Sequence, residues 1–176
     1  GSPNQGDVLI QNGTAIFRSW YGFEGVTSFD FSTFTTNWMT RISTPSNGYA
    51  ANAFWGDGPS MSLTPDSIYL FDAQDNLWRL DLATGQMLWH VPWPGVTAMS
   101  RPVAMQGLVY GFFGDGTVRA YSEADGQQVE IVMKAPLWYW TKAKEWRDLV
   151  GGLGVAGDTL IVTTGCRSVY AIQRAP

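Results

Sequence analysis

The stretch of sequence that decides the fold reads Leu77-Trp78-Arg79-Leu80-Asp81-Leu82-Ala83-Thr84-Gly85-Gln86-Met87-Leu88-Trp89. Two short apolar segments are joined here by a turn that contains Thr84 and Gly85. Apolar segments of about four to eight residues between turn residues indicate β-strands, and the 3.6-residue periodicity of a helix is missing. The stretch therefore predicts a β-hairpin whose second strand leads to Trp89.

The same pattern occurs at three other places in the chain. Residues 26–38 match residues 77–89 in register at an offset of 51 residues. Asp30 aligns with Asp81, and Trp38 aligns with Trp89. Residues 118–126 repeat the strand and the turn without a Trp after them, and a fourth copy starts at residues 168–172. A repeat of roughly 40 to 50 residues is typical of folds that stack one supersecondary unit.

Each repeat has room for four strands, and repeated four-stranded antiparallel units are typical of a β-propeller. The predicted blades span residues 7–43, 60–91, 102–133 and 152–173. The last blade is incomplete, because its fourth strand is missing. The sequence therefore predicts an all-β fold, a four-bladed propeller-like array in one domain of residues 1–176, in which residues 1–2 are interpreted as the remnant of an expression tag.

The run from Ile68 to Trp89 resembles one blade of the pyrroloquinoline-quinone-like (PQQ-like) propeller repeat. In that family a strand is followed by a leucine–aspartate pair, a Thr-Gly turn and a Trp. The resemblance covers most of the chain and is strongest in the second unit. It implies that the Trp docks on the adjoining blade, while the Asp and the Thr bind nearby backbone groups. The residues that it assigns to this docking are Asp30, Trp38, Asp81, Thr84, Gly85 and Trp89.

The number of blades bears on how the propeller closes. The resemblance implies closed propellers of about seven or eight blades, so we predict that this chain of four units is half of an eight-bladed propeller, either as a homodimer or as a piece of a longer polypeptide. An unclosed array leaves apolar strand surface exposed. That surface could instead be covered in two other ways. A partner protein could complete the propeller, or the chain could close into a compact four-bladed ring.

Composition excludes several classes of protein. Apolar residues make up 45% of the chain, aromatic residues 14% and charged residues 15%, which indicates a folded rather than a disordered chain. The net charge of −4 provides no basic field for a phosphate backbone, so we expect no nucleic acid partner. No apolar run approaches the ~20 residues of a membrane-spanning helix, so we expect no membrane span.

The resemblance also raises the question of catalysis, because quinoprotein dehydrogenases share this repeat. Their chemistry would require a vicinal Cys pair against the quinone and Glu, Asn and Asp around a calcium ion. Cys166 instead stands between Gly165 and Arg167, and His90 is the single histidine, which is too few residues for a zinc site. We therefore expect no catalytic residue, no cofactor and no metal in this chain.

Two segments depart from the repeat, residues 46–60 and 136–151, and both are rich in aromatic residues. Thr141 fits an N-cap, and the spacing after it predicts a short helix over 141–150. The aromatic side chains either cap the propeller core or form a binding platform, since Trp and Tyr are enriched at interface hot spots. The candidate binding residues are Tyr49, Trp55, Trp93, Trp138, Tyr139, Trp140 and Trp146.

These observations predict a non-catalytic module that acts as a protein-binding or scaffolding domain through its rim loops. Its partner would be another protein or a second copy of the chain. One alternative is a glycan-binding module that uses exposed Trp side chains, because an aromatic ring suits a protein surface and a sugar face alike. Another is a fragment of a quinoprotein-type dehydrogenase whose catalytic residues lie elsewhere. The family resemblance implies a periplasmic or extracellular location.

Overall fold

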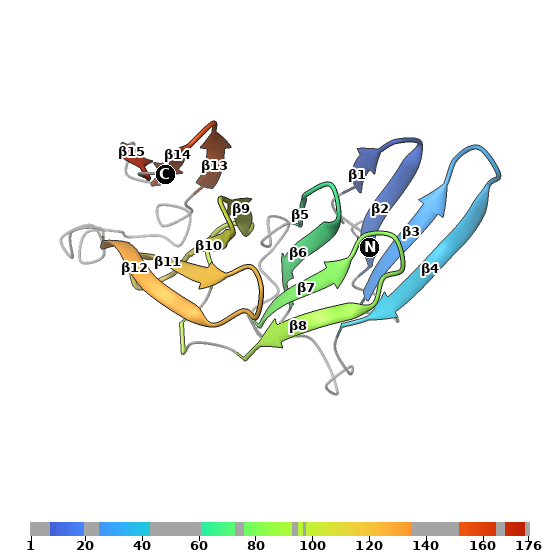
Figure 1. Ribbon diagram of the computed structural model, residues 1–176, viewed down its shortest axis with the longest axis horizontal. Helices are drawn as coiled ribbons and strands as arrows, with labels where there is room; N and C mark the ends of the chain where they lie inside the picture. The colour runs from blue at the N-terminus through green and yellow to red at the C-terminus, as the bar shows by residue number, and fades with distance from the viewer. Residues whose placement is uncertain are drawn as a thin grey trace, which may run out of the picture.

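The computed structural model describes residues 8–19, 25–42, 61–72, 76–92, 95–96, 98–134, 152–164 and 168–174. These residues form four antiparallel sheets, and none of them lies in a helix. In Figure 1 the sheets follow one another in chain order, from blue to red, like the blades of a fan. The prediction of an all-β, four-bladed propeller-like array is confirmed.

Every blade takes its strands in the order of the chain. The first blade contains β1 (Val8–Gln11), β2 (Thr14–Ser19), β3 (Gly25–Asp30) and β4 (Thr35–Arg41). The second contains β5 (Ser62–Leu63), β6 (Ser67–Phe71), β7 (Leu77–Asp81) and β8 (Met87–Val91). The third contains β9 (Val103–Met105), β10 (Leu108–Phe112), β11 (Thr117–Ser122) and β12 (Gln128–Lys134). In the fourth, the described residues form β13 (Gly152–Ala156), β14 (Thr159–Thr163) and β15 (Val169–Gln173).

Turn chemistry explains why the first two strands of a blade form a tight hairpin. Asn12 and Gly13 both have positive φ, 50° and 79°, and Gln106 and Gly107 repeat this with 51° and 72°. Two consecutive residues with positive φ are what a two-residue hairpin needs to match the twist of its strands.

The fourth strand of each complete blade pairs with the third through a β-bulge. The register shifts fall at homologous positions, between Ser28 and Phe29, between Arg79 and Leu80, and between Ala120 and Tyr121. The pairing of the second strand with the third has no such shift in any of the four blades. The repeat seen in the sequence is therefore also a repeat of strand register.

The hydrophobic core lies between the blades rather than inside any one of them. Ile16 of the first blade packs with Leu80 of the second, Tyr69 of the second with Phe113 of the third, and the third blade packs against Leu160 of the fourth. Among the described residues no buried cluster joins the fourth blade to the first, and the fan is open there in Figure 1. Each blade depends on its neighbours for burial, as expected of a repeat protein.

Candidate functional site

The turn between the third and fourth strands is built by its aspartate. In the second blade Asp81 Oδ1 accepts hydrogen bonds of 2.7 Å from both the amide and the hydroxyl of Thr84, and these bonds lower the pKa of Asp81 below its usual value. Gly85 follows with φ 71° and donates its amide to Asp81 O at 2.9 Å. The left-handed conformation at Gly85 is one that a glycine adopts without strain.

The first blade builds the same turn with different residues. Asp30 Oδ1 accepts from the hydroxyl and the amide of Ser32, both at 2.6 Å, and from the amide of Thr33 at 3.1 Å, which lowers the pKa of Asp30. Phe34 stands where the second blade has Gly85, and its φ is 55°. The first blade therefore holds a bulky residue in the left-handed region, where bulky residues are outliers.

The first seam, between the first and second blades, is formed by Trp38 of β4. Its indole Nε1 donates to Leu82 O at 3.2 Å, and Thr40 Oγ1 donates to Gly85 O at 2.6 Å. The indole ring lies so close to the turn that a Cβ added at Gly85 would stand 2.5 Å from Trp38 Cδ2. Gly85 is thus required twice, once for its backbone angle and once for the space that the Trp occupies.

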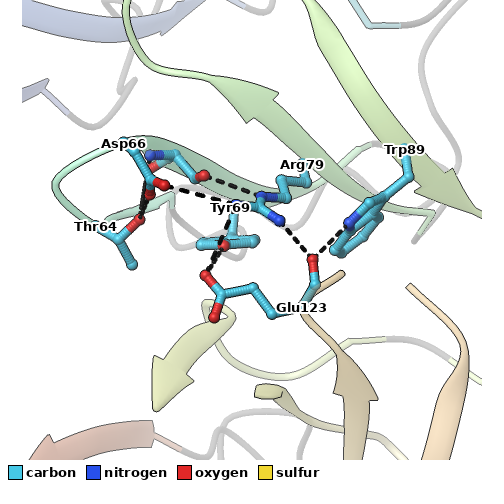
Figure 2. A network of polar contacts seen from close by, with 7 residues as sticks. Thr64, Asp66, Tyr69, Arg79, Trp89 and Glu123 are labelled. Carbon is cyan, nitrogen blue, oxygen red and sulfur yellow. Dashed lines mark hydrogen bonds and ion pairs between the residues drawn. The ribbon is translucent and has the colours of Figure 1, made fainter. Parts of the chain in front are cut away.

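The second seam repeats this contact and adds charge. Trp89 Nε1 donates to Glu123 O at 2.9 Å, and Arg79 Nη1 donates to the same oxygen at 2.6 Å (Figure 2). A Cβ added at Gly126 would stand 2.9 Å from Trp89 Cε3. In the first two seams, a Trp of one blade therefore lies on the glycine turn of the next.

The carboxylate of Glu123 ties the third blade to the inner strands of the second. Tyr69 Oη donates to Glu123 Oε1 at 2.5 Å, and Arg79 Nη2 lies 3.9 Å from the same oxygen (Figure 2). Burial, followed by the hydrogen bond to this carboxylate, raises the pKa of Tyr69. Arg79 also lies 3.8 Å from Asp66 Oδ2, and the hydroxyl of Thr64 donates to Asp66 Oδ1 at 2.9 Å and lowers its pKa.

The third seam replaces the indole with an ion pair. Glu130 of β12 occupies the repeat position of Trp38 and Trp89, and its Oε1 accepts from Arg174 Nη1 at 2.6 Å. The same nitrogen donates to Tyr110 Oη at 3.1 Å. The contact between an outer strand and the following blade is kept, although its chemistry has changed.

One repeat position explains all three seams. The residue that follows the third strand is Leu82, Glu123 or Arg174, and each of these contacts the outer-strand residue of the preceding blade. We call it the seam position. The predicted docking residues include neither this position nor Tyr69 and Arg79. The signal in the sequence is the residue directly after the third strand of each repeat, Leu82, Glu123 or Arg174.

A groove of about 410 Å³ lies where the first strands of all four blades meet. The described residues that line it are Leu9, Ile10, Gln11, Met61, Ser62, Leu63, Arg101, Val103, Ala104, Gly154 and Val155. A quinone with calcium would need carboxylates and an aromatic platform, and this lining offers neither. The described lining therefore does not fit that cofactor.

The predicted binding residues Tyr49, Trp55, Trp93, Trp138, Tyr139, Trp140 and Trp146 lie outside the described residues, as does the predicted helix. His90 is exposed and stacks on Trp78, with ring centroids 4.9 Å apart. In the described part of the chain no three His, Cys, Asp or Glu side chains are grouped so that they could hold a metal ion. No helix among these residues has the length and apolarity to cross a membrane.

The chain matches no protein-family model, and no curated protein matches it significantly. Solved structures do share its fold. BamB from Moraxella catarrhalis is similar with a TM-score of 0.67 and 16% identity, over 96% of this chain and 43% of that one. The computationally designed Ika4 protein gives a TM-score of 0.69 and 10% identity, over 99% and 94% of the two chains. A europium-containing methanol dehydrogenase gives a TM-score of 0.59 and 19% identity, over 74% of this chain and 25% of that one. This chain thus spans less than half the length of BamB and of the dehydrogenase, and the likeness supports the PQQ-like propeller fold that the repeat predicted.

Proposed function

We propose that this chain is a non-catalytic propeller module that binds a partner protein through its rim loops. The observation that carries the proposal is Phe34, in the turn between β3 and β4, whose side chain is 77% exposed. The second and third blades have Gly85 and Gly126 at this position. A left-handed conformation costs a non-glycine residue roughly 1–2 kcal/mol, and an exposed ring regains little of it by packing. Strain held at an exposed aromatic residue points to a binding role.

Phe34 belongs to an apolar surface on the first blade. Its ring packs edge-on against Phe29 at 6.4 Å, and Phe31 packs against the same ring at 5.8 Å. Strand pairing puts Val8 and Ile10 on the face of the sheet that also carries Phe29, and they are 57% and 68% exposed. Exposed apolar side chains gathered on one blade are typical of protein interaction sites. The surface therefore favours a protein partner over a sugar.

The non-catalytic part of the proposal is supported by how the ionisable residues are used. Tyr69 and Arg79 both bond to Glu123 across the second seam, and Glu130 bonds to Arg174 across the third. The described residues that line the groove add no carboxylate. An extracytoplasmic location is part of the same proposal and is supported by the resemblance of the repeat to the PQQ-like family.

Site-specific photo-crosslinking tests this function. A benzophenone side chain in place of Phe34 should give a discrete adduct with a partner protein in the cells that produce the chain. The same side chain in place of Leu88, which is 49% exposed on the outer strand of the second blade, serves as the control and should not. Trp55→Ala and Trp138→Ala should also reduce the adduct, because the proposal includes the rim loops in the binding surface.

Three results would contradict the proposal. Equal adducts from both positions, or none from either, would remove the evidence for a specific surface on the first blade. Binding on a glycan array that Phe34→Ser abolishes would favour the glycan alternative. Dye-linked alcohol oxidation by the chain with added PQQ and calcium would show that the module is catalytic.

A further inference from the structure

The groove where the first strands of the four blades meet is lined by two rows of homologous residues. The first row consists of Leu9, Ser62, Val103 and Gly154. The residues of this row lie opposite homologous residues of the second strands, namely Ile16, Tyr69, Tyr110 and Ile161. The second row, one residue further along each strand, consists of Ile10, Leu63, Ala104 and Val155. Each blade therefore contributes one residue to each row.

The second row is aliphatic in all four blades. Ile10 is 68% exposed and Val155 is 41% exposed. None of the described residues that line the groove is aromatic or acidic. The volume of about 410 Å³ lies in the range of small-molecule sites, which are mostly apolar with a few polar groups. A saturated hydrocarbon chain suits such a lining, because it gains free energy on leaving water and needs no polar partner.

Arg101 supplies a positive charge at one end of the groove. It is exposed and precedes Val103 of the first row by two residues. Within the described part of the chain its side chain forms no hydrogen bond and no ion pair. Arg79, Arg119 and Arg174, in contrast, each lie beside a carboxylate of the chain. The guanidinium of Arg101 is therefore available to an external anion, and its planar fork matches a carboxylate through two parallel hydrogen bonds.

Ser62 adds a second polar group near the same end. Its Oγ is buried and has no hydrogen-bond partner. A buried polar atom without a partner is uncommon and points to a group that is not part of the chain. Ser62 is homologous to Val103, so it lies two residues further along the groove than Arg101, or roughly 7 Å of extended backbone. It pairs with Tyr69, whose hydroxyl contacts the third blade, and so it faces the blade that carries Arg101.

Gln11 marks the other end of the groove. Like Met105, it directly precedes a two-residue hairpin turn, so these two residues are homologous. Arg101 precedes Met105 by four residues, which corresponds to roughly 13 Å of extended backbone. The groove is therefore long enough for an extended octanoate or decanoate chain.

We propose that this groove binds an aliphatic carboxylate. The carboxylate accepts hydrogen bonds from the guanidinium of Arg101 and the hydroxyl of Ser62, and the hydrocarbon chain lies along the second row towards Gln11. The aliphatic lining accounts for the chain, and the unpaired cation with the unpartnered hydroxyl accounts for the head group. This binding is independent of a partner protein at Phe34.

Isothermal titration calorimetry of the chain with sodium octanoate tests the site. Octan-1-ol carries the same hydrocarbon chain without the charge and should bind at least about fivefold more weakly, because a hydrogen bond between charged groups is lost. From hexanoate to octanoate to decanoate the affinity should rise roughly fourfold for each methylene that enters the groove. Added salt should weaken octanoate binding, since the ion pair with Arg101 is partly screened.

Three variants assign the head group. Arg101→Gln should weaken octanoate binding at least about fivefold and remove most of its salt dependence. Lys134→Gln removes an exposed cation that does not line the groove, and it should change the affinity less than about twofold. Ser62→Ala should weaken octanoate binding about fivefold, yet unfold at no lower urea concentration, because the hydroxyl has no partner within the fold.

Several results would overturn the proposal. Absence of octanoate binding would do so, as would equal binding of octanoate and octan-1-ol or equal effects of Arg101→Gln and Lys134→Gln. An affinity that does not rise from hexanoate to decanoate would show that Arg101 attracts anions without use of the groove. Tighter binding of acetyl-trileucine than of decanoate would assign the groove to the carboxyl end of a polypeptide instead. Should Ser62→Ala not fold, the comparison of octanoate with octan-1-ol on the unchanged chain still decides the matter.

Discussion

Replacing Gly85 with Ala should be among the most damaging single-methyl changes in this fold. The new Cβ would have to adopt φ 71°, which costs roughly 1–2 kcal/mol. It would also stand 2.5 Å from Trp38 Cδ2 and 2.7 Å from Thr40 Oγ1, so the indole must move. Overpacking of this kind costs roughly 1–3 kcal/mol. We therefore expect a loss of about 2–5 kcal/mol from the free energy of unfolding.

The chain contains a matched control at Gly157. Its φ is 63°, and a Cβ added there would meet no atom within 4 Å. Gly157→Ala should therefore show the cost of the backbone angle alone, about 1–2 kcal/mol. The difference between the two variants isolates the contacts of the Gly85 turn with Trp38 and Thr40.

Urea unfolding followed by far-UV circular dichroism measures both changes. In a background that carries both Trp38→Ala and Thr40→Ala, the cost of Gly85→Ala should fall to within about 0.5 kcal/mol of that of the control, because both side chains that the new Cβ would meet are gone. If Gly85→Ala costs no more than Gly157→Ala, or if the difference survives the removal of both side chains, the seam does not work as described.

Three further perturbations test the other seams and turns. Tyr69→Phe removes the hydrogen bond to Glu123 and should lower the free energy of unfolding by about 1.5–3 kcal/mol in urea titrations, whereas Glu123→Gln keeps an acceptor and should cost less. A double-mutant cycle of Glu130→Gln and Arg174→Gln should give a coupling of about 0.2–1 kcal/mol that shrinks with added salt, since both side chains are partly exposed. The hydrogen bonds from Thr84 lower the pKa of Asp81 in the folded chain, so they stabilise the fold at pH values above the pKa of about 3.9 that the side chain has when unfolded. This contribution is lost as the pH falls through the lower pKa of the folded state. Below pH 4, the urea midpoint of the unchanged chain should therefore fall more steeply than that of Asp81→Asn.

The sequence alone predicted the blades because their defining features are local. Asp81, Thr84 and Gly85 build a turn within a few residues, and the same spacing recurs at fixed intervals. Turn residues and strand alternation therefore predicted an all-β array of four units. The bulge in each outer strand was not predicted. At a bulge two residues of one strand lie opposite a single residue of the other, and this arrangement does not change the pattern of apolar residues in the sequence.

The seams were harder to predict because they join residues far apart in the chain. Tyr69 and Glu123 are separated by 54 positions, and nothing near either one reveals the other. The sequence shows that the third repeat has no Trp after its turn and has Glu130 at that position instead. Its meaning depends on Arg174, which lies 44 residues away and reaches back across the seam.

The turn of the first blade differs from the turns at the inner seams. The first two seams each need a Trp on an outer strand and a glycine at the next turn, as Trp38 and Gly85 show. A head-to-tail seam between two copies would find Phe34 in place of that glycine. The chemistry of the first two seams therefore does not extend to the turn of the first blade.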